Sequence, residues 1–447
     1  MRNPVVVVDG MAEADQGLLL PTATLQLGWY SSWRNVHFDL TPLRAAVGSP
    51  SPVVADLLDL AAAVYLADLA LPRGRNEQFV RDVGLHVPVR EPELWRNLKS
   101  EVNYLLYLLT GDNIAVTFHE RRTEAESKGS PVSVAPTDCD CVCLLSGGVD
   151  SLAGAVALLR TGRRPLFVTH RSGNPTAAEA QRFVIEALRR FRPSLRHVLV
   201  TLMPRSSVGT LPFPPADVRE PSRRSRSLLF MALGIAAAAG LGSTEVYACD
   251  NGVLTVALPL SASRVGGLST RSTHPAVLGR LSALCRDLGL TCQVINPFVY
   301  QTKTELIRDV LRPVLSLDEI QATVSCWMTG RRHRQCGGCV PCLLRRVSML
   351  AAGLPDEAYE MDLLARPGDY VGTDAYVNTV DFLSYVNRLS ALSNADLLLS
   401  APALLDLQAH NVSVADVVSM LKRFAAEGRE VAEGQFPAAA RLGSELG

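Results

Sequence analysis

Two groups of residues in this 447-residue chain have types and spacings suited to chemistry. The first is a tight turn, Ser146-Gly-Gly-Val-Asp-Ser151, which separates a short apolar run from an amphipathic stretch. The second is a set of four cysteines, Cys326, Cys336, Cys339 and Cys342, which lie within 17 residues of each other. The turn predicts a phosphate site, and the cysteines predict a metal site.

The glycine turn is suited to an anion because Gly147 and Gly148 have no Cβ, so a ligand can approach the main chain closely. The helix expected beyond them supplies free N–H groups and a partial positive charge. Ser146 and Ser151 add hydroxyl donors, and Asp150 can either cap the helix or hold a magnesium ion. A strand-to-helix turn without a ligand is the alternative. No Gly-Lys-Ser/Thr follows, so the turn is not a Walker A loop.

The four cysteines supply the number of thiolates that a closed tetrahedral zinc site needs. The spacing Cys336-Gly-Gly-Cys339-Val-Pro-Cys342 places sulfurs on one turn, and a longer loop brings Cys326 back to them. Four protein ligands leave no open position, so we expect a structural zinc, with an iron–sulfur cluster as the alternative. His333 and the basic run Arg331–Arg334 lie inside this loop and are expected to face solvent.

Composition and charge limit the classes of protein that fit. Hydrophobic residues make up 48% and charged residues 20%, which is typical of a globular protein, here with two or three domains. Lys plus Arg (44) equals Asp plus Glu (44), so bulk charge does not indicate a nucleic-acid or membrane partner. No apolar run approaches the roughly 18 residues of a membrane helix, and the start, MRNPVVVVDG, is too short for a signal-peptide core. We expect a cytoplasmic protein with reduced cysteines.

The elements that must position these residues alternate between strands and helices over residues 140–355. Apolar runs predict strands over 141–145, 165–169, 197–202, 245–249 and 292–295. Between them, helices are expected near 151–161, 176–191, 226–241, 274–288 and 302–311. This order predicts βαβ units in an α/β fold with a parallel sheet, and ligands at the carboxyl ends of its strands.

Two regions without a chemical motif flank this part. Residues 1–135 mix strand-like runs (5–9, 22–29, 115–119) with helical patterns (51–71, 91–110), which predicts an α+β accessory domain. Residues 124–137 are expected to be a linker, because they are rich in Ser, Pro and charge. Residues 370–447 predict a helical C-terminal region, with helices over 380–392, 395–407 and 413–426.

The turn Ser146–Ser151 resembles the SGGxDS signature of the PP-loop ATP pyrophosphatases, which follows the first strand of their parallel sheet. Together with the cysteine segment SCWMTGRRHRQCGGCVPCLLRR, it resembles the 7-cyano-7-deazaguanine synthase (QueC) family over residues 140–355. Gln301-Thr-Lys-Thr-Glu305 resembles the family's TKxE motif, and Pro221–Phe230 stands where the family has an Arg-containing turn near the substrate. The resemblance implies a PP-loop (adenine nucleotide alpha hydrolase-like) sheet with flanking helices, and ATP, Mg²⁺ and Zn²⁺ as cofactors.

The resemblance also implies roles for particular residues. Those implied in catalysis are Asp150, Lys303 and Arg226. Those implied in nucleotide binding are Leu145, Ser146, Gly147, Gly148, Val149, Asp150, Ser151, Thr169 and His170. Those implied in substrate binding are Arg226, Asn251, Gly252, Thr273 and His274, and the metal ligands are Cys326, Cys336, Cys339 and Cys342.

A plain structural alternative stands beside several of these roles. Lys303 could be an exposed lysine in the first turn of a helix. Arg226 is favoured because it adjoins a helix start, but it and the arginines at 223 and 224 could form a solvated face. Asn251-Gly252 could be only a tight turn, and His274 a helix cap or a core residue.

Proteins of the QueC family use ATP to adenylate the carboxylate of 7-carboxy-7-deazaguanine, form the amide with ammonia, and dehydrate it to the nitrile with a second ATP. The present chain is longer and resembles enlarged QueC-like proteins of anti-phage operons (the Qat and type IV CBASS systems). That similarity implies transfer of the acyl group to an amine of a partner protein from the same operon, and, in the family generally, a homodimer.

Three alternatives to protein acylation stay open. The chain could release free nitrile (preQ0) as an ordinary synthase. It could be a PP-loop tRNA-modifying enzyme, which should have a basic surface that a net charge of zero does not predict. It could also be a non-enzymatic zinc-stabilised binding module, which would need neither the glycine turn nor Lys303.

Overall fold

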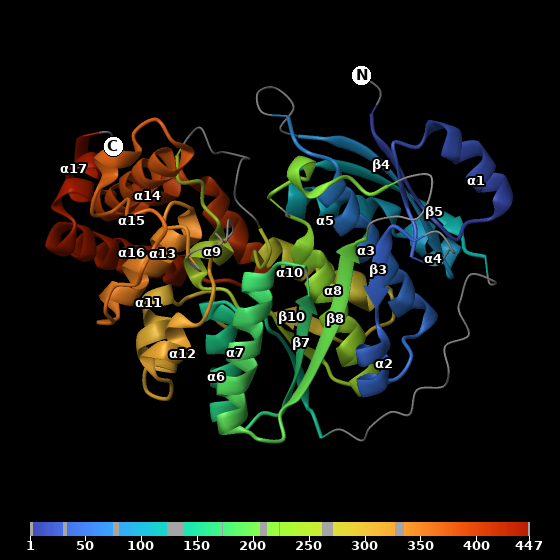
Figure 1. Cartoon of the computed structure of the whole chain (residues 1–447), viewed down its shortest axis with the longest axis horizontal. Coiled ribbons are helices and arrows are strands. Elements are labelled where there is room, and N and C mark those ends of the chain that lie inside the picture. The colour runs from blue at the N-terminus through green and yellow to red at the C-terminus, as the bar shows by residue number, and fades with distance from the viewer. Residues whose placement is uncertain are drawn as a thin grey trace.

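A computed structural model describes residues 3–29, 34–74, 80–122, 138–171, 173–205, 212–222, 224–261, 271–326 and 335–445. The linker predicted over 124–137, Arg223, and the loop that contains His333 lie outside the described residues. The N-terminal region and the C-terminal helices lie on opposite sides of the core sheet (Figure 1). Their division from the core at 135 and 370 stays a prediction.

The core sheet has six strands in the order β10-β9-β6-β7-β8-β3. Five of them pair in parallel, and β3 pairs antiparallel with β8 at one edge. The strands are β3 (Val36–Asp39), β6 (Cys141–Leu144), β7 (Pro165–Arg171), β8 (Arg196–Pro204), β9 (Glu245–Tyr247) and β10 (Gln293–Ile295). The predicted α/β fold with a parallel sheet is therefore confirmed. After β6 the chain adds β7 and β8 on one side and β9 and β10 on the other, so β6 and β9 flank a topological switch point.

Helices cover both faces of this sheet because the apolar side chains of its strands point alternately to one face and to the other. Val142 and Leu144 pack in one cluster with α8, whereas Cys143 packs in another with α6. Gly234 of α8 permits a close approach, since a Cβ there would lie 2.6 Å from a methyl of Val246. The helices are α6 (Val149–Arg160), α7 (Pro175–Phe191), α8 (Arg226–Leu241), α9 (Gly252–Val256), α10 (Pro275–Asp287), α11 (Lys303–Glu305), η5 (Leu306–Leu311), α12 (Leu317–Gln321) and α13 (Val340–Ala351).

The N-terminal region is α/β and not the predicted α+β. Four of its strands form a sheet in the order β2-β1-β4-β5 and all pair in parallel, because helices connect them along the chain, whereas β3 joins the core sheet. The strands are β1 (Val5–Val8), β2 (Leu25–Leu27), β4 (Asp82–Val89) and β5 (Asn113–Glu120). The helices are α1 (Glu13–Leu19), η1 (Leu20–Thr22), α2 (Thr41–Val47), α3 (Pro52–Ala70), α4 (Pro92–Asn97) and α5 (Lys99–Thr110), the last two replacing the single helix expected over 91–110.

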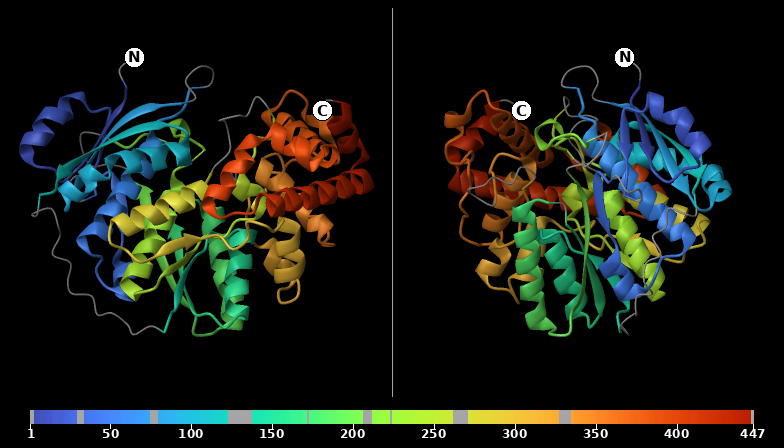
Figure 2. Two further views of the ribbon diagram at one scale, coloured as in Figure 1. Left: turned by 180° about the vertical axis from the view of Figure 1, so that it is seen from behind. Right: turned by 45° about the vertical axis from the view of Figure 1, so that its right-hand side comes forward.

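Helix α3 joins the N-terminal region to the core. It is buried along almost its whole length and packs against α8 (Figure 2). A single apolar cluster contains residues of α3, α8 and both sheets. The N-terminal region therefore shares a hydrophobic core with the sheet that carries the candidate site.

The C-terminal region is helical, as predicted. Its elements are α14 (Asp374–Ala391), α15 (Asn394–Ser400), η7 (Pro402–His410), α16 (Val414–Gln435) and α17 (Pro437–Glu445). They form a second apolar cluster with α13 and α9 of the core. Within the described part of the chain, no helix is both long and apolar enough to cross a membrane.

Candidate nucleotide and metal site

A cavity of about 350 Å³ lies at the carboxyl ends of β6 and β9, at the switch point of the core sheet. The glycine turn forms one wall, the start of α8 with the preceding loop forms another, and the metal segment forms a third. Its lining includes Asp150, Arg226, Asp250, Lys303 and Cys326. The fold thus gathers residues from at least five separate stretches of sequence at the place where parallel sheets bind ligands.

Two hydroxyl groups, those of Ser146 and Ser151, form hydrogen bonds within the glycine turn. The Oγ atoms of Ser146 and Ser151 lie 3.0 Å apart, and the Gly148 N–H donates to Ser146 Oγ at 3.2 Å. Gly147 has a φ of +88°, and a Cβ there would lie 3.0 Å from the backbone nitrogen of Gln181. Glycine is thus required at this position. Because α6 begins at Val149, within the turn, its first N–H groups lack partners within the helix.

Asp150 and Lys303 form an ion pair in the cavity wall. Lys303 Nζ donates to Asp150 Oδ2, and Asn251 Nδ2 donates to Oδ1 at 3.2 Å. The Lys303 side chain is 1% exposed, so the alternative of an exposed first-turn lysine is wrong. Thr302 and Glu305 form a capping box that fixes this turn. Asp150 does not act as an N-cap, since the cap position of α6 is Gly148.

Asp250 is a candidate functional residue that sequence reasoning did not select. Thr273 Oγ1 donates to its Oδ2 at 2.9 Å. Burial and the neighbouring Asp150 charge raise the pKa of Asp250 to about 7. Its position three residues after the end of β9 was the available signal, because ligands gather at the carboxyl ends of strands. Asp150 and Asp250 together offer the carboxylate oxygens that Mg²⁺ prefers.

Several predicted nucleotide ligands lie behind the cavity wall. Leu145 and Val149 are 0% exposed and pack in the core next to α6. Thr169 is also fully buried, and its hydroxyl lies 2.9 Å from His197 Nε2. His170 is fully buried, with its ring packed edge-on against Phe230. These four residues support the site from beneath, and direct contact with a nucleotide stays a prediction.

The predicted substrate residues divide in a similar way. Thr273 lines the cavity, and Asn251 reaches it through Asp150. Gly252 instead permits packing, since a Cβ there would lie 2.4 Å from the Val299 carbonyl oxygen. His274 caps α10, with its Nδ1 accepting from the backbone N–H two residues later at 3.2 Å. Burial lowers the pKa of His274 to about 4, which keeps the ring neutral. The role of each as a substrate ligand stays a prediction.

Arg226 is the first residue of α8 and lines the cavity, with its guanidinium over the Phe230 ring at 5.2 Å from the centroid. The suggestion that its neighbours form a solvated face is wrong for Arg224. That side chain is buried and donates to the Thr110 carbonyl oxygen at 2.9 Å, at the C-terminal end of α5. A cation there also complements the helix dipole.

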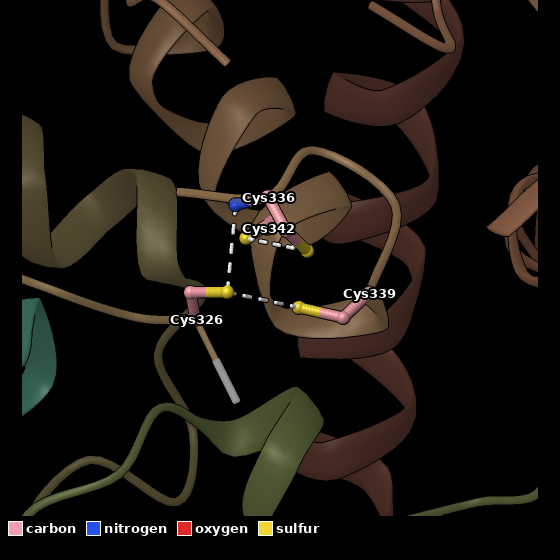
Figure 3. A group of neighbouring side chains, drawn as sticks. All are labelled: Cys326, Cys336, Cys339 and Cys342. Atoms are coloured by element: carbon pink, nitrogen blue, oxygen red, sulfur yellow. Dashed lines mark hydrogen bonds between the residues drawn. The ribbon is translucent and has the colours of Figure 1, made fainter. Parts of the chain in front are cut away.

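The four cysteines converge as a tetrahedral site requires (Figure 3). Their sulfur atoms all lie within 4.8 Å of one another, and the pairs Cys336–Cys342 and Cys326–Cys339 are each 3.9 Å apart. Zinc–sulfur bonds of about 2.3 Å in a tetrahedron place the sulfurs about 3.8 Å apart. All four residues are buried, so the donor set and its geometry fit a structural Zn²⁺.

The metal segment also supports the glycine turn. The Val324 N–H donates to the Gly147 carbonyl oxygen at 3.0 Å. Arg345 of α13 is fully buried, donates to Thr323 Oγ1 at 2.7 Å, and pairs with Glu357. The arginine of the Cys-Leu-Leu-Arg motif therefore ties the helix of the metal site to Thr323, which is next to the residue that bonds the glycine turn.

Comparisons with known proteins find similar sequences among named enzymes. No protein-family model matches the chain. The 7-cyano-7-deazaguanine synthase of Synechococcus elongatus is 27% identical over 229 residues, which cover 48% of this chain and 93% of that protein. The synthase of Cupriavidus pinatubonensis is 27% identical over 230 residues, covering 48% and 95%. That of Magnetococcus marinus is 26% identical over 243 residues, covering 50% and 97%. Half of the chain is thus similar to almost the whole of these enzymes.

Proposed function

We propose that this chain is a PP-loop ATP pyrophosphatase that acts as a carbon–nitrogen ligase of the 7-cyano-7-deazaguanine synthase kind. Its substrates would be ATP and the carboxylate of 7-carboxy-7-deazaguanine. The observation that carries the proposal is the buried Asp150–Lys303 pair beside the glycine turn, in one cavity with Asp250 and Arg226. The similarity of half of the chain to named synthases supports the same reaction class.

The chemistry needs positioning and charge neutralisation. The N–H groups of the glycine turn would hold the departing pyrophosphate, and Lys303 would neutralise part of its charge. Magnesium held by Asp150 and Asp250 would supply the remaining positive charge at the phosphates. Arg226 would orient the carboxylate, whose oxygen attacks the α-phosphorus as the bond to pyrophosphate breaks. An amine nitrogen then attacks the acyl carbon, the acyl–phosphate bond breaks, and AMP leaves.

We further propose that the amine belongs to a partner protein and that the product is an amide. The N-terminal region and the C-terminal helices flank the end of the core sheet at which the cavity lies, so an acceptor would approach between them (Figure 1). An amine held in attack geometry would outcompete dilute ammonia by about 7 kcal/mol or more in well-oriented cases. A secondary amide cannot be dehydrated to a nitrile, so the second ATP-dependent step would be absent. The defence setting rests only on the resemblance to enlarged QueC-like proteins.

The test is pyrophosphate exchange into ATP, measured with Mg²⁺ and with or without 7-carboxy-7-deazaguanine. We expect exchange that depends on the acid, and no stimulation by tRNA. Ammonium or purified products of neighbouring genes are then added, and small-molecule products and intact protein masses are recorded. Acid-independent or tRNA-dependent exchange would contradict the adenylation proposal. Efficient release of free nitrile with ammonium, without a mass shift on any partner, would contradict the protein acceptor.

A further inference from the structure

The N-terminal region reaches the cavity wall through one buried carboxylate, Asp68, near the end of α3. Its Oδ2 accepts from the Ser225 backbone N–H at 3.0 Å and from Ser225 Oγ at 2.8 Å. Ser225 is the residue before α8, and its own side chain provides no cap for that helix. Asp68 therefore supplies, from 157 residues away, the acidic group that the N-terminus of α8 favours.

Asp68 is held as a carboxylate by two arginines. Its Oδ1 lies 2.6 Å from Arg81 Nη2 and 3.4 Å from Arg73 Nη1. Burial alone would raise the pKa of Asp68, but the charges of Arg81 and Arg73 outweigh this effect, so the pKa lies below its ordinary value. Arg73 also donates to Ser222 Oγ at 2.8 Å, and its backbone N–H donates to Glu220 at 2.8 Å. Glu220, Ser222 and Ser225 are thus each bonded to the N-terminal region.

These bonded residues form or adjoin the cavity wall. Pro221, Ser222, Arg226 and Ser227 all line the cavity, and Arg226 follows directly after Ser225. We propose that Asp68 is a positioning residue, which fixes the first turn of α8 so that the Arg226 guanidinium meets the carboxylate of the substrate. The proposal rests on the proposed function for the identity of that substrate. It assigns the N-terminal region a role in acid binding and none in ATP binding.

The same helix offers a matched control. Asp56 of α3 is likewise 0% exposed, and it accepts from the Arg90 backbone N–H at 2.9 Å and from Trp95 Nε1 at 3.1 Å. None of these residues lines the cavity. Asp68→Asn and Asp56→Asn both remove one buried negative charge from α3, so both should lower stability, but only the first touches the wall.

The experiment measures the KM for 7-carboxy-7-deazaguanine and for ATP by pyrophosphate exchange in the full chain. Asp68→Asn should raise the KM for the acid roughly tenfold to a hundredfold, because small displacements of a positioning group have effects of this size. The KM for ATP should not change, and Asp56→Asn should change neither. Ser225→Ala removes only one of the two hydrogen bonds and should shift the same KM in the same direction by a smaller factor. If Asp68→Asn fails to fold, the KM of Ser225→Ala for the acid tests the proposal instead.

Hydrogen–deuterium exchange separates this proposal from the proposed function. Asp68→Asn should speed amide exchange over residues 224–228, but not over the glycine turn, and Asp56→Asn should do neither. If the wild type shows no acid-dependent pyrophosphate exchange, the proposed function fails and the amide exchange still tests the anchor. Equal KM values for the acid in Asp68→Asn and Asp56→Asn, or equal amide exchange at the start of α8 in these two variants, would overturn the proposal.

Discussion

Replacing Arg345 by Met should cost more stability than most single substitutions in this chain. The Arg345 side chain is 0% exposed, and its guanidinium donates to Glu357 Oε1 at 2.8 Å, to Thr323 Oγ1 at 2.7 Å and to the Ile320 carbonyl oxygen at 3.3 Å. Methionine keeps much of the volume but leaves the Glu357 carboxylate, 8% exposed, without its counter-charge. Breaking a buried pair from one side costs about 3–5 kcal/mol, so we expect a loss of that size.

The next residue of α13 is a matched control. Arg346 pairs with Asp356 and Asp362, whose side chains are 36% and 35% exposed, so these carboxylates can return to water when the arginine is removed. Its stacking on Tyr359 and Phe436, at 5.0 and 4.7 Å from the ring centroids, would also be lost. Partly exposed ion pairs and cation–π contacts each contribute up to about 1 kcal/mol, and contacts that share one guanidinium do not add, so Arg346→Met should cost about 1–2 kcal/mol.

Urea unfolding in zinc-containing buffer measures both free energies. A double-mutant cycle of Arg345→Met with Glu357→Gln should show that the two changes together cost less than the sum of the single changes, by about 0.5–3 kcal/mol. Equal losses for Arg345→Met and Arg346→Met, or a coupling energy near zero, would refute the view that the buried Arg345–Glu357 pair stabilises the helix of the metal site.

Cys339→Ser should lose bound zinc and stability together, since binding free energy at such a site is folding free energy; unchanged melting of a metal-free protein would contradict this. Asp150→Asn should abolish pyrophosphate exchange while circular dichroism stays native, and normal exchange would remove this residue from the phosphate site. The pKa of His274 is about 4 in the folded protein, below its value in the unfolded chain. The contribution of His274 to the free energy of unfolding is therefore present above about pH 6.5 and is lost as pH falls toward 4. His274→Gln should flatten the decline of stability over that interval, and an unchanged slope would argue against it. Gly252→Ala should cost about 1–3 kcal/mol through overpacking against a backbone carbonyl, whereas Gly434→Ala, with nothing within 4 Å, should cost nothing; equal effects would be inconsistent with the packing.

Much of the core fold was predictable because its signals are local. Apolar runs of strand length, the glycine turn and the tight cysteine spacing each depend on a few adjacent residues. Strand β4 was missed although Val83, Leu85, Val87 and Val89 alternate as a half-buried strand requires. Gly84 and Pro88 interrupt that pattern, and proline in a central strand argues against strand assignment, yet Pro88 pairs here in register with β5.

The supporting contacts of the site were not predictable from local sequence. The ion pair of Asp150 with Lys303 joins residues 153 positions apart, and Asp68 meets Ser225 across 157. No spacing or periodicity within one element encodes such a contact. The sequence could name Lys303 and Arg226 as candidates, but only the fold shows that the first is buried and that the second begins a helix capped from another region.

The N-terminal region and the C-terminal helices contact opposite sides of the cavity wall, so part of their length serves the site itself. On one side, Asp68 of α3 fixes the start of α8 and with it Arg226. On the other, α16 packs on the turn that carries Lys303, where Thr302 Oγ1 donates to Glu427 at 3.2 Å. Both contacts lie next to residues proposed to meet the substrates, so each region would position the site as well as flank the approach to it. The protein acceptor is therefore tested by the product and not by chain length: a mass shift on a partner protein would support it, and release of free nitrile with ammonium would contradict it.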